Sequence, residues 1–136
     1  MYLTRLLYFS RASQGLGMDL DQILASAREQ NSKNNITGAL WFDGDYFVQV
    51  LEGGRHAVSE TYHRIAADER HTDIELASCE MVDSRLFHKW RMAYFADTQE
   101  NRDLITKYSG HNQLIPEKMS ARSLLHVLAE GQLLGH

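Results

Sequence analysis

Short apolar segments with the composition of β-strands alternate with helical patterns along the first 96 residues. The predicted strands are residues 2–10, 36–42, 46–51, 74–82 and 90–95. Gly15 and Gly17 mark a loop after the first strand, and Asp43-Gly44 between the second and third is typical of a hairpin turn. The pattern therefore predicts a sheet of five strands that includes one tight hairpin.

Two helices are predicted between these strands. The first covers residues 19–32, where Asp19 is a candidate N-cap and Gln22 its capping-box partner. Its regularly spaced positions are Leu20, Leu24, Ala27 and Asn31, and those of the second helix, 55–68, are Val58, Tyr62 and Ile65. The resulting order, β-α-β-β-α-β-β, predicts an α+β fold of the ferredoxin-like type, with one extra strand and both helices on one face of the sheet.

The strand at residues 46–51 is apolar on both of its faces. Phe47 and Leu51 point to one face, and Val48 and Val50 join Tyr46 on the other. A sheet with two apolar faces needs cover on both sides. Because two helices occupy only one face, we expect another part of the chain or a second subunit to cover the other.

The last 40 residues have a helical pattern that fits this need. Apolar residues recur at Leu104, Ile105 and Tyr108, and again as a stripe of Ala121, Leu124, Leu125 and Leu128. We therefore divide the chain into a sheet domain, residues 1–97, and a C-terminal helical extension, residues 98–136. The extension is expected to pack on the sheet as ordinary core or to lie at a subunit interface of a homo-oligomer.

Composition and charge exclude several classes of function. The 136 residues are 43% hydrophobic and 24% charged, as in an ordinary globular domain, and the net charge of −4 disfavours nucleic acid as a partner. One cysteine, Cys79, and histidines that never pair at helical spacing give no disulfide and no metal site. No signal-peptide pattern and no long apolar run is present, which predicts a soluble cytoplasmic protein without a membrane partner. No nucleotide-binding glycine motif or catalytic constellation stands out, so an enzyme is disfavoured.

Three polar residues fall at positions where the pattern calls for apolar ones. Gln49 lies between Phe47 and Leu51 on one strand face, Asn31 continues the apolar stripe of the first helix, and Tyr8 lies in the first strand. A buried amide without hydrogen-bond partners costs roughly 1–3 kcal/mol. Gln49 and Asn31 must therefore bond either to a local polar network in the protein or to a ligand, and their spacing alone does not choose between these alternatives.

Six segments of the chain resemble one family in order and spacing. They are RLLYFS (residues 5–10), Asn31 with ITGAL (36–40), FVQVLEG (47–53), YHRI (62–65), DERH (68–71) and FHKWRM (87–92). This set resembles the BLUF domains, blue-light sensors that use FAD, and the resemblance covers about residues 3–96. Residues 107–119 are also similar to the short stand-alone members, which carry no fused enzyme. The family fold agrees with the strand order predicted above.

The resemblance implies roles for the unusual polar residues. The isoalloxazine ring of the flavin would lie between the two helices, with Tyr8 as photochemical donor and Gln49 bridging Tyr8 and the ring. Asn31 and Arg64 would hold the pyrimidine edge, although an ion pair between Arg64 and Asp68 is an alternative for Arg64. The other residues implied at the flavin site are Ser10, Ile23, Arg28, Ile36, Phe47, Asp68, Arg70 and His71. Trp90 and Met92 would lie on the fifth strand, from which either could approach Gln49.

The chain also departs from the family at the edge of this site. Gln30 stands where relatives often have Asn or His, Ser32 follows Asn31, and Ala27 replaces a hydroxyl residue that is often seen in the family. These differences leave the Tyr8 and Gln49 pair intact.

The expected function is therefore blue-light reception rather than catalysis. The expected cofactor is non-covalently bound FAD, with FMN as an alternative. Light would rearrange the bonds among Tyr8, Gln49 and the flavin, and the signal would pass to an unidentified protein partner. The alternatives are a flavin-dependent enzyme for a small substrate and a constitutive oligomeric adaptor that has lost its cofactor.

Overall fold

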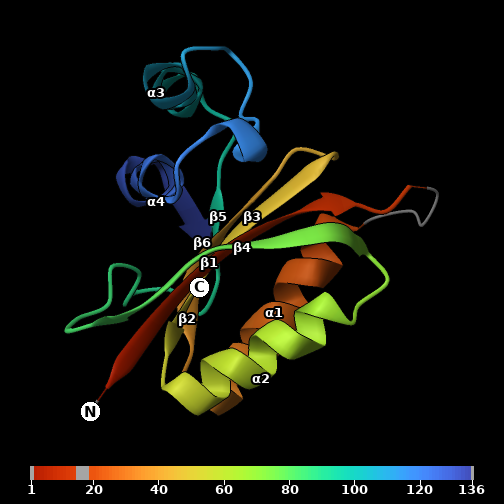
Figure 1. The fold of residues 1–136 in the computed structure, drawn as a ribbon, viewed down its shortest axis with the longest axis vertical. Coiled ribbons are helices and arrows are strands. Elements are labelled where there is room, and N and C mark those ends of the chain that lie inside the picture. Colours follow the sequence, from red (N-terminus) through yellow and green to blue (C-terminus); the bar gives the residue numbers. More distant parts are fainter. Residues whose placement is uncertain (1, 15–18, 136) are drawn as a thin grey trace.

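The computed structural model describes residues 2–14 and 19–135, which form a mixed sheet with helices on both faces (Figure 1). Among these residues the sheet has six strands in the order β4-β1-β3-β2-β5-β6. Their bounds are β1 Leu3–Ala12, β2 Thr37–Phe42, β3 Tyr46–Gly53, β4 His71–Val82, β5 Ala93–Phe95 and β6 Leu133–Gly135. Only the β2–β5 pair among them is parallel. The first four strands have the ferredoxin-like order, so the predicted fold class is confirmed.

Two helices cover one face of the sheet, as the pattern predicted. They are α1, Leu20–Asn34, and α2, Arg55–Ala66 (Figure 1). The Asp19 side chain accepts a hydrogen bond from the Gln22 backbone N–H at 3.3 Å, which confirms the predicted N-cap. The predicted bounds of the two helices differ from the observed ones by at most two residues at either end. The loop predicted around Gly15 and Gly17 lies outside the described residues.

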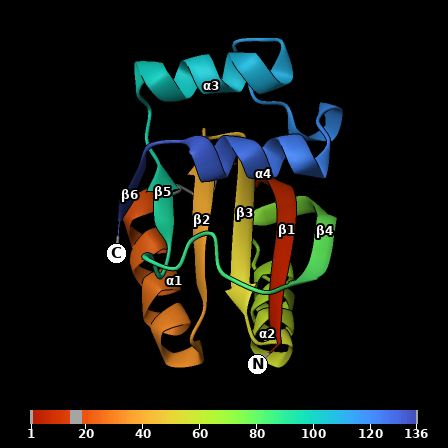
Figure 2. The ribbon, with the colours of Figure 1, turned by 90° about the vertical axis from the view of Figure 1, so that its left-hand side faces the viewer.

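The C-terminal segment covers the opposite face. It contains α3, Gln99–Ser109, a 3₁₀ turn at Pro116–Lys118, and α4, Ala121–Glu130, which crosses the sheet (Figure 2). Leu124, Val127 and Leu128 of α4 are buried in one cluster with Leu7 and Val50 of the sheet. The predicted apolar stripe therefore lies in the core of this chain rather than on its surface. The division of the chain at residue 97 stays a prediction.

The alternation predicted for β3 is confirmed by the two core clusters. Phe47 and Leu51 belong to the cluster on the α1–α2 side, and Val48 and Val50 belong to the cluster on the α4 side.

Gly38 permits the close approach of β2 and β3 at this level, because a Cβ atom there would lie 1.9 Å from the Val50 carbonyl oxygen.

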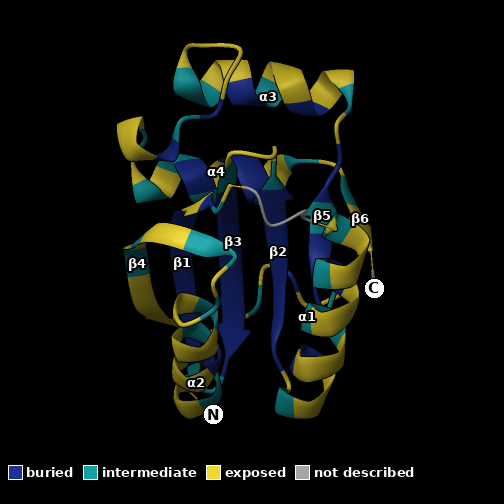
Figure 3. Cartoon of the chain, turned by 90° about the vertical axis from the view of Figure 1, so that its right-hand side faces the viewer, coloured by how far each residue is buried: buried dark blue, intermediate teal, exposed yellow. Residues whose placement is uncertain are grey.

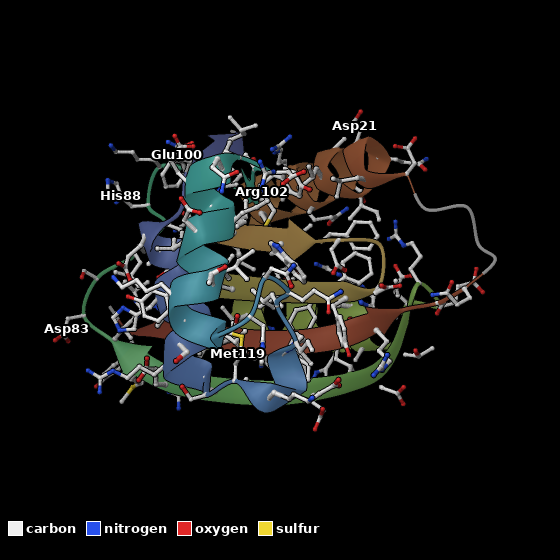
Figure 4. The ribbon with its side chains drawn as sticks, turned by 90° about the horizontal axis from the view of Figure 1, so that it is seen from above. Asp21, Asp83, His88, Glu100, Arg102 and Met119 are labelled. Atoms are coloured by element: carbon white, nitrogen blue, oxygen red, sulfur yellow. The ribbon has the colours of Figure 1, made fainter. Side chains whose placement is uncertain are left out.

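The fifth predicted strand, residues 90–95, is too long, because only Ala93–Phe95 pair as β5. The backbone before it bonds elsewhere; for example, the Trp90 carbonyl accepts a hydrogen bond from the Gly38 N–H at 3.2 Å. Trp90 and Met92 therefore belong to an irregular segment, residues 83–92, in which Figure 4 labels Asp83 and His88. Figure 4 also labels Glu100 and Arg102 on α3, which lies in front of the sheet in that view. Strand β6 was not predicted, since three residues are too few to show a periodic pattern.

Candidate functional site

A cavity of about 510 Å³ lies between α1 and α2 above the sheet. Figure 3 looks from this side and shows the buried strands β2 and β3 between the two exposed helices. The cavity is lined by Tyr8, Leu40, Phe47, Gln49 and Leu51 of the strands, by Ile23, Ser26, Ala27, Gln30 and Asn31 of α1, by Thr61, Arg64 and Ile65 of α2, and by Ala67, Asp68, Arg70 and His71 beyond it. Its size and its mixture of apolar walls with a few polar groups are typical of a cofactor site.

A chain of hydrogen bonds lies at the floor of this cavity. Tyr8 and Gln49 face each other across β1 and β3, and the Tyr8 hydroxyl donates to Gln49 Oε1. Gln49 Nε2 in turn donates to Met92 Sδ at 3.4 Å, and all three side chains are buried. Burial, helped by the nearby Tyr62 and Asp68, raises the pKa of the Tyr8 phenol well above its ordinary value. Tyr8 is therefore a protonated donor held against an amide at neutral pH.

Asn31 connects the cavity to the segment before β5. Its Nδ2 donates to the Arg91 carbonyl at 2.6 Å, and the residue is 2% exposed. Its Oδ1 accepts no hydrogen bond from any residue that the structure describes. This oxygen keeps some accessible surface, since no fully buried polar side-chain atom among the described residues lacks a partner. Because Asn31 lines the cavity, this oxygen is available to a donor on a bound ligand.

The alternative ion pair between Arg64 and Asp68 is contradicted by the structure. Asp68 pairs instead with Arg70, whose Nη2 lies 2.6 Å from Asp68 Oδ2, and this contact lowers the pKa of the Asp68 carboxyl. The helical spacing assumed for Arg64 and Asp68 fails because α2 ends at Ala66. The exposed Arg64 donates to Thr61 Oγ1 at 3.3 Å and lines the cavity. Its charge is thus available at the cavity wall.

His71 closes the cavity beside Phe47, with ring centroids 4.5 Å apart. Its Nδ1 lies 2.7 Å from the hydroxyl of Ser10, which is fully buried and does not line the cavity. Ser10 therefore acts on the site through His71. Burial lowers the pKa of His71 to about 4, so the imidazole is neutral at pH 7.

The lowered pKa of His71 predicts a loss of stability in mild acid. An unfolded histidine titrates near pH 6.5, whereas the folded one titrates near pH 4, so the unfolded chain binds the extra proton first as the pH falls. This group's contribution is present above pH 6.5 and is lost towards pH 4. We expect it to lower the free energy of unfolding by about 1–2 kcal/mol between pH 7 and pH 5. Denaturant unfolding of wild type and His71→Gln at both pH values measures this difference.

The exposed His56 on α2 provides the control for this measurement. His56→Gln should keep the pH dependence of the wild type, whereas His71→Gln should reduce it. Equal pH dependence in wild type and His71→Gln would contradict the prediction.

Several residues that the sequence assigned to the flavin site lie outside the cavity lining. Ile36 is fully buried in the core cluster beneath the helices, and Trp90 packs on the cluster of the opposite face. The Arg28 Nε donates to the Met92 carbonyl at 3.0 Å. Met92 also lies outside the lining, but it contacts Gln49, so Met92 rather than Trp90 is the neighbour of this amide. Trp90 lies away from the cavity because β5 begins only at Ala93, so the side chains before it do not alternate between the two faces of the sheet.

Other lining residues were missed by the sequence interpretation. They are Ser26, Leu40, Leu51, Thr61, Ile65 and Ala67. For Leu51 and Leu40 a signal was present, because Leu51 shares a face with Gln49 and Leu40 pairs with Gln49 across β2 and β3. For Thr61 and Ala67 the signal was absent, since their exposure to the cavity depends on how α2 docks.

The described residues contain no cluster of three or more potential metal-binding side chains. None of the helices in the described part of the chain is both long and apolar enough to cross a membrane.

Comparisons with known proteins agree with this geometry. The family model described as "BLUF: Sensors of blue-light using FAD" matches residues 3–93. The photoactivated adenylate cyclase subunit beta of Euglena gracilis is 37% identical over 86 residues, which are 62% of this chain and 10% of that protein. The blue light- and temperature-regulated antirepressor BluF of Escherichia coli K12 is 32% identical over 84 residues, 62% of this chain and 21% of that protein. The chain thus matches only a small part of these relatives.

A solved structure extends the similarity to the C-terminal segment. The photo-activated state of BlsA has a TM-score of 0.85 and 28% sequence identity, and the match covers 94% of this chain and 93% of that one. The family match spans more than half of the chain and includes the Tyr8–Gln49 pair on the cavity floor. The chain therefore belongs to the BLUF family of flavin-binding blue-light sensors.

Proposed function

We propose that this chain is a blue-light photoreceptor that binds FAD without a covalent bond in the cavity between α1 and α2. The observation that carries the proposal is the buried hydrogen bond from Tyr8 to Gln49 at the cavity floor. FMN is the alternative flavin, because both cofactors carry the same ring. The proposed role is that of a sensor and not of an enzyme.

The residues of the cavity fit a flavin ring. An isoalloxazine is flat, with apolar faces and one edge that carries carbonyl and N–H groups. Ile23 and Ile65 line the cavity from the two helices, and Phe47 lines it from the sheet, which suits the apolar faces. Asn31 offers an acceptor and Arg64 offers donors for the polar edge. These two residues would hold the ring, with Gln49 beside it.

The side chains on the cavity floor are arranged to move a proton. A bound flavin would supply light absorption and an excited state that is oxidising enough to accept an electron. Tyr8 can give up an electron and its phenolic proton, and Gln49 Oε1 already accepts that O–H group. Among the described residues, Gln49 Nε2 donates only to the Met92 sulfur, a weak acceptor, so this end of the amide is weakly held. Tyr8 recovers the electron and the proton, and the amide keeps its new hydrogen bonds until the dark state returns.

The proposed output passes through the C-terminal segment. Met92 is followed directly by β5, whose Phe95 packs in one cluster with Leu124 and Val127 of α4. A change at Gln49 and Met92 would therefore act on strand β5 and on the contacts of α4, which biases self-association or binding of a protein partner. A homo-oligomeric state and a cytoplasmic location, both expected from the sequence, belong to this proposal.

The purified protein is expected to be yellow and to release FAD on heating or acidification, as chromatography would show.

Blue light should shift the flavin absorption slightly to the red, and darkness should reverse the shift, since Gln49 would bond more strongly to the ring carbonyl. The same lit and dark samples, compared by light scattering with and without candidate partners, report the output. A colourless protein that also refuses added flavin would refute the proposal and favour the adaptor alternative.

A further inference from the structure

Three consecutive backbone carbonyls before β5 are each held by a donor from α1 or β2. The Trp90 carbonyl accepts from the Gly38 N–H at 3.2 Å. The Arg91 carbonyl accepts from Asn31 Nδ2 at 2.6 Å, and the Met92 carbonyl accepts from Arg28 Nε at 3.0 Å. Hydrogen bonds to its main chain therefore fix the position of residues 90–92, which place the Met92 side chain against Gln49.

Arg28 and Asn31 divide this task along one face of α1. They are three residues apart, a spacing that places both side chains on the same side of a helix. Asn31 lines the cavity, but Arg28 does not. Asn31 therefore reaches both the cavity and the segment 83–92, whereas the polar contact of Arg28 is with the Met92 carbonyl alone among the described residues. A hydrogen bond from a charged guanidinium is stronger than one between neutral groups.

The C-terminal strand meets the same guanidinium. Gly135 of β6 pairs with Ala93, the residue after Met92, and has a φ of +141°. A Cβ atom on Gly135 would lie 2.5 Å from Arg28 Nη2 and 3.0 Å from the Met92 carbonyl oxygen. Figures 2 and 3 both show β5 and β6 beside α1. The backbone of β6 therefore packs directly against the Arg28–Met92 contact.

We infer that Arg28 is a positioning residue for the contact between Met92 and Gln49. Its guanidinium fixes the Met92 carbonyl, and through Gly135 it joins strand β6 to the photoactive side chains. The inference rests on the proposed photoreceptor function, and it replaces the flavin-binding role that the sequence implied for Arg28. A residue that holds this segment, but not the ring, should change how fast the site rearranges and not how tightly it binds flavin.

The test compares Arg28→Ala and Arg28→Lys with Lys33→Ala, a control at an exposed position on the same helix. Three properties are measured: flavin affinity, the rate of dark recovery after blue light, and hydrogen exchange of the amides of residues 92–95 and 133–135. For Arg28→Ala we expect unchanged flavin affinity and an unchanged red shift. We expect recovery to be faster by roughly threefold or more, because one bond that must reorganise is missing, and amide exchange to be faster. Arg28→Lys should be intermediate and Lys33→Ala should match the wild type.

Gly135→Ala tests the same contact from the other side. Its added methyl group would displace the Arg28 guanidinium and crowd the Met92 carbonyl, and the positive φ of this residue strains an alanine there. None of these changes lies at the cavity lining. It should reproduce the faster recovery and the faster exchange of residues 92–95, again with unchanged flavin affinity. This variant also keeps the inference testable if Arg28→Ala does not fold.

The outcomes separate the inference from the proposed function. An Arg28→Ala protein that loses flavin affinity roughly tenfold, as expected for loss of a direct ligand contact, and recovers at the wild-type rate would overturn the inference and restore the flavin-binding role. Recovery that is unchanged or slower at full affinity would also overturn it. If the wild type itself shows no reversible shift, the proposed function fails. Amide exchange in the dark then decides: faster exchange in Arg28→Ala than in Lys33→Ala supports the positioning role, and equal exchange refutes it.

Discussion

Replacing Gln49 with leucine is expected to abolish the reversible light response while flavin stays bound. The Gln49 amide is the link between the Tyr8 hydroxyl and Met92 Sδ, and leucine can neither accept the phenolic proton nor rotate into new hydrogen bonds. Leucine has a similar size and suits a position between Phe47 and Leu51 in the apolar cluster, so the fold should tolerate it. Absorption spectra before and after blue light measure the response.

Tyr8→Phe is expected to have the same effect for a different reason. Phenylalanine keeps the buried ring beside Tyr62 but removes the proton that Gln49 Oε1 accepts. The control is Tyr46→Phe, because the Tyr46 hydroxyl bonds to Glu117 in the C-terminal segment, on the face of the sheet opposite the cavity. Tyr46→Phe should keep the red shift. A wild-type photocycle in Gln49→Leu would show that the mechanism assigned to this amide is wrong.

The largest loss of stability is expected at Glu52, which is fully buried at the end of β3. Its carboxylate accepts from Arg5 Nε and from the backbone N–H groups of Leu86 and Phe87, each at 2.9 Å. Glu52→Ala leaves the buried Arg5 without this partner and removes the acceptor of both N–H groups. Breaking a buried ion pair in this way costs about 3–5 kcal/mol. Urea unfolding of the protein measures the loss.

Glu80 offers a matched control for Glu52. It is the second acidic neighbour of Arg5, with a separation of 3.6 Å, but its side chain is 55% exposed. Glu80→Ala should therefore cost less than about 1 kcal/mol, as is usual for exposed ion pairs. Similar losses for the Glu52 and Glu80 variants would contradict the importance assigned to the buried network.

The network around Glu52 also explains how an irregular segment keeps a defined position. Arg85 donates to the Glu52 carbonyl and to Thr37 Oγ1, each at 2.9 Å, and Phe87 is buried in the core cluster under α4. The start of the segment is thus anchored by the end of β3, and its end is held by Arg28 and Asn31. Between these anchors the chain has no regular secondary structure of its own.

Local periodicity was enough to predict the elements on which the site is built. The alternation along β3 placed Phe47, Gln49 and Leu51 on one face, and burial on both sides of the sheet confirmed it. The Asp19 cap and the hairpin at Asp43-Gly44 were also visible, because each depends on residues that are neighbours in the chain. The polar residues at apolar positions pointed to the floor of the cavity for the same reason.

Contacts between distant segments left no such pattern, and only the tertiary structure decided them. Arg28 was assigned to the flavin from the family resemblance, yet it bonds to a carbonyl 64 residues away, and Asn31 bonds to one 60 residues away. A hydrogen bond to a backbone carbonyl depends on where two segments meet and not on which residue carries the carbonyl. The lengths of β5 and β6 and the choice of Met92 over Trp90 beside Gln49 have the same origin. The sequence by itself therefore determined the strands and the polar pair that face the cavity, whereas docking of the segment 83–92 against α1 determined which side chains surround that pair.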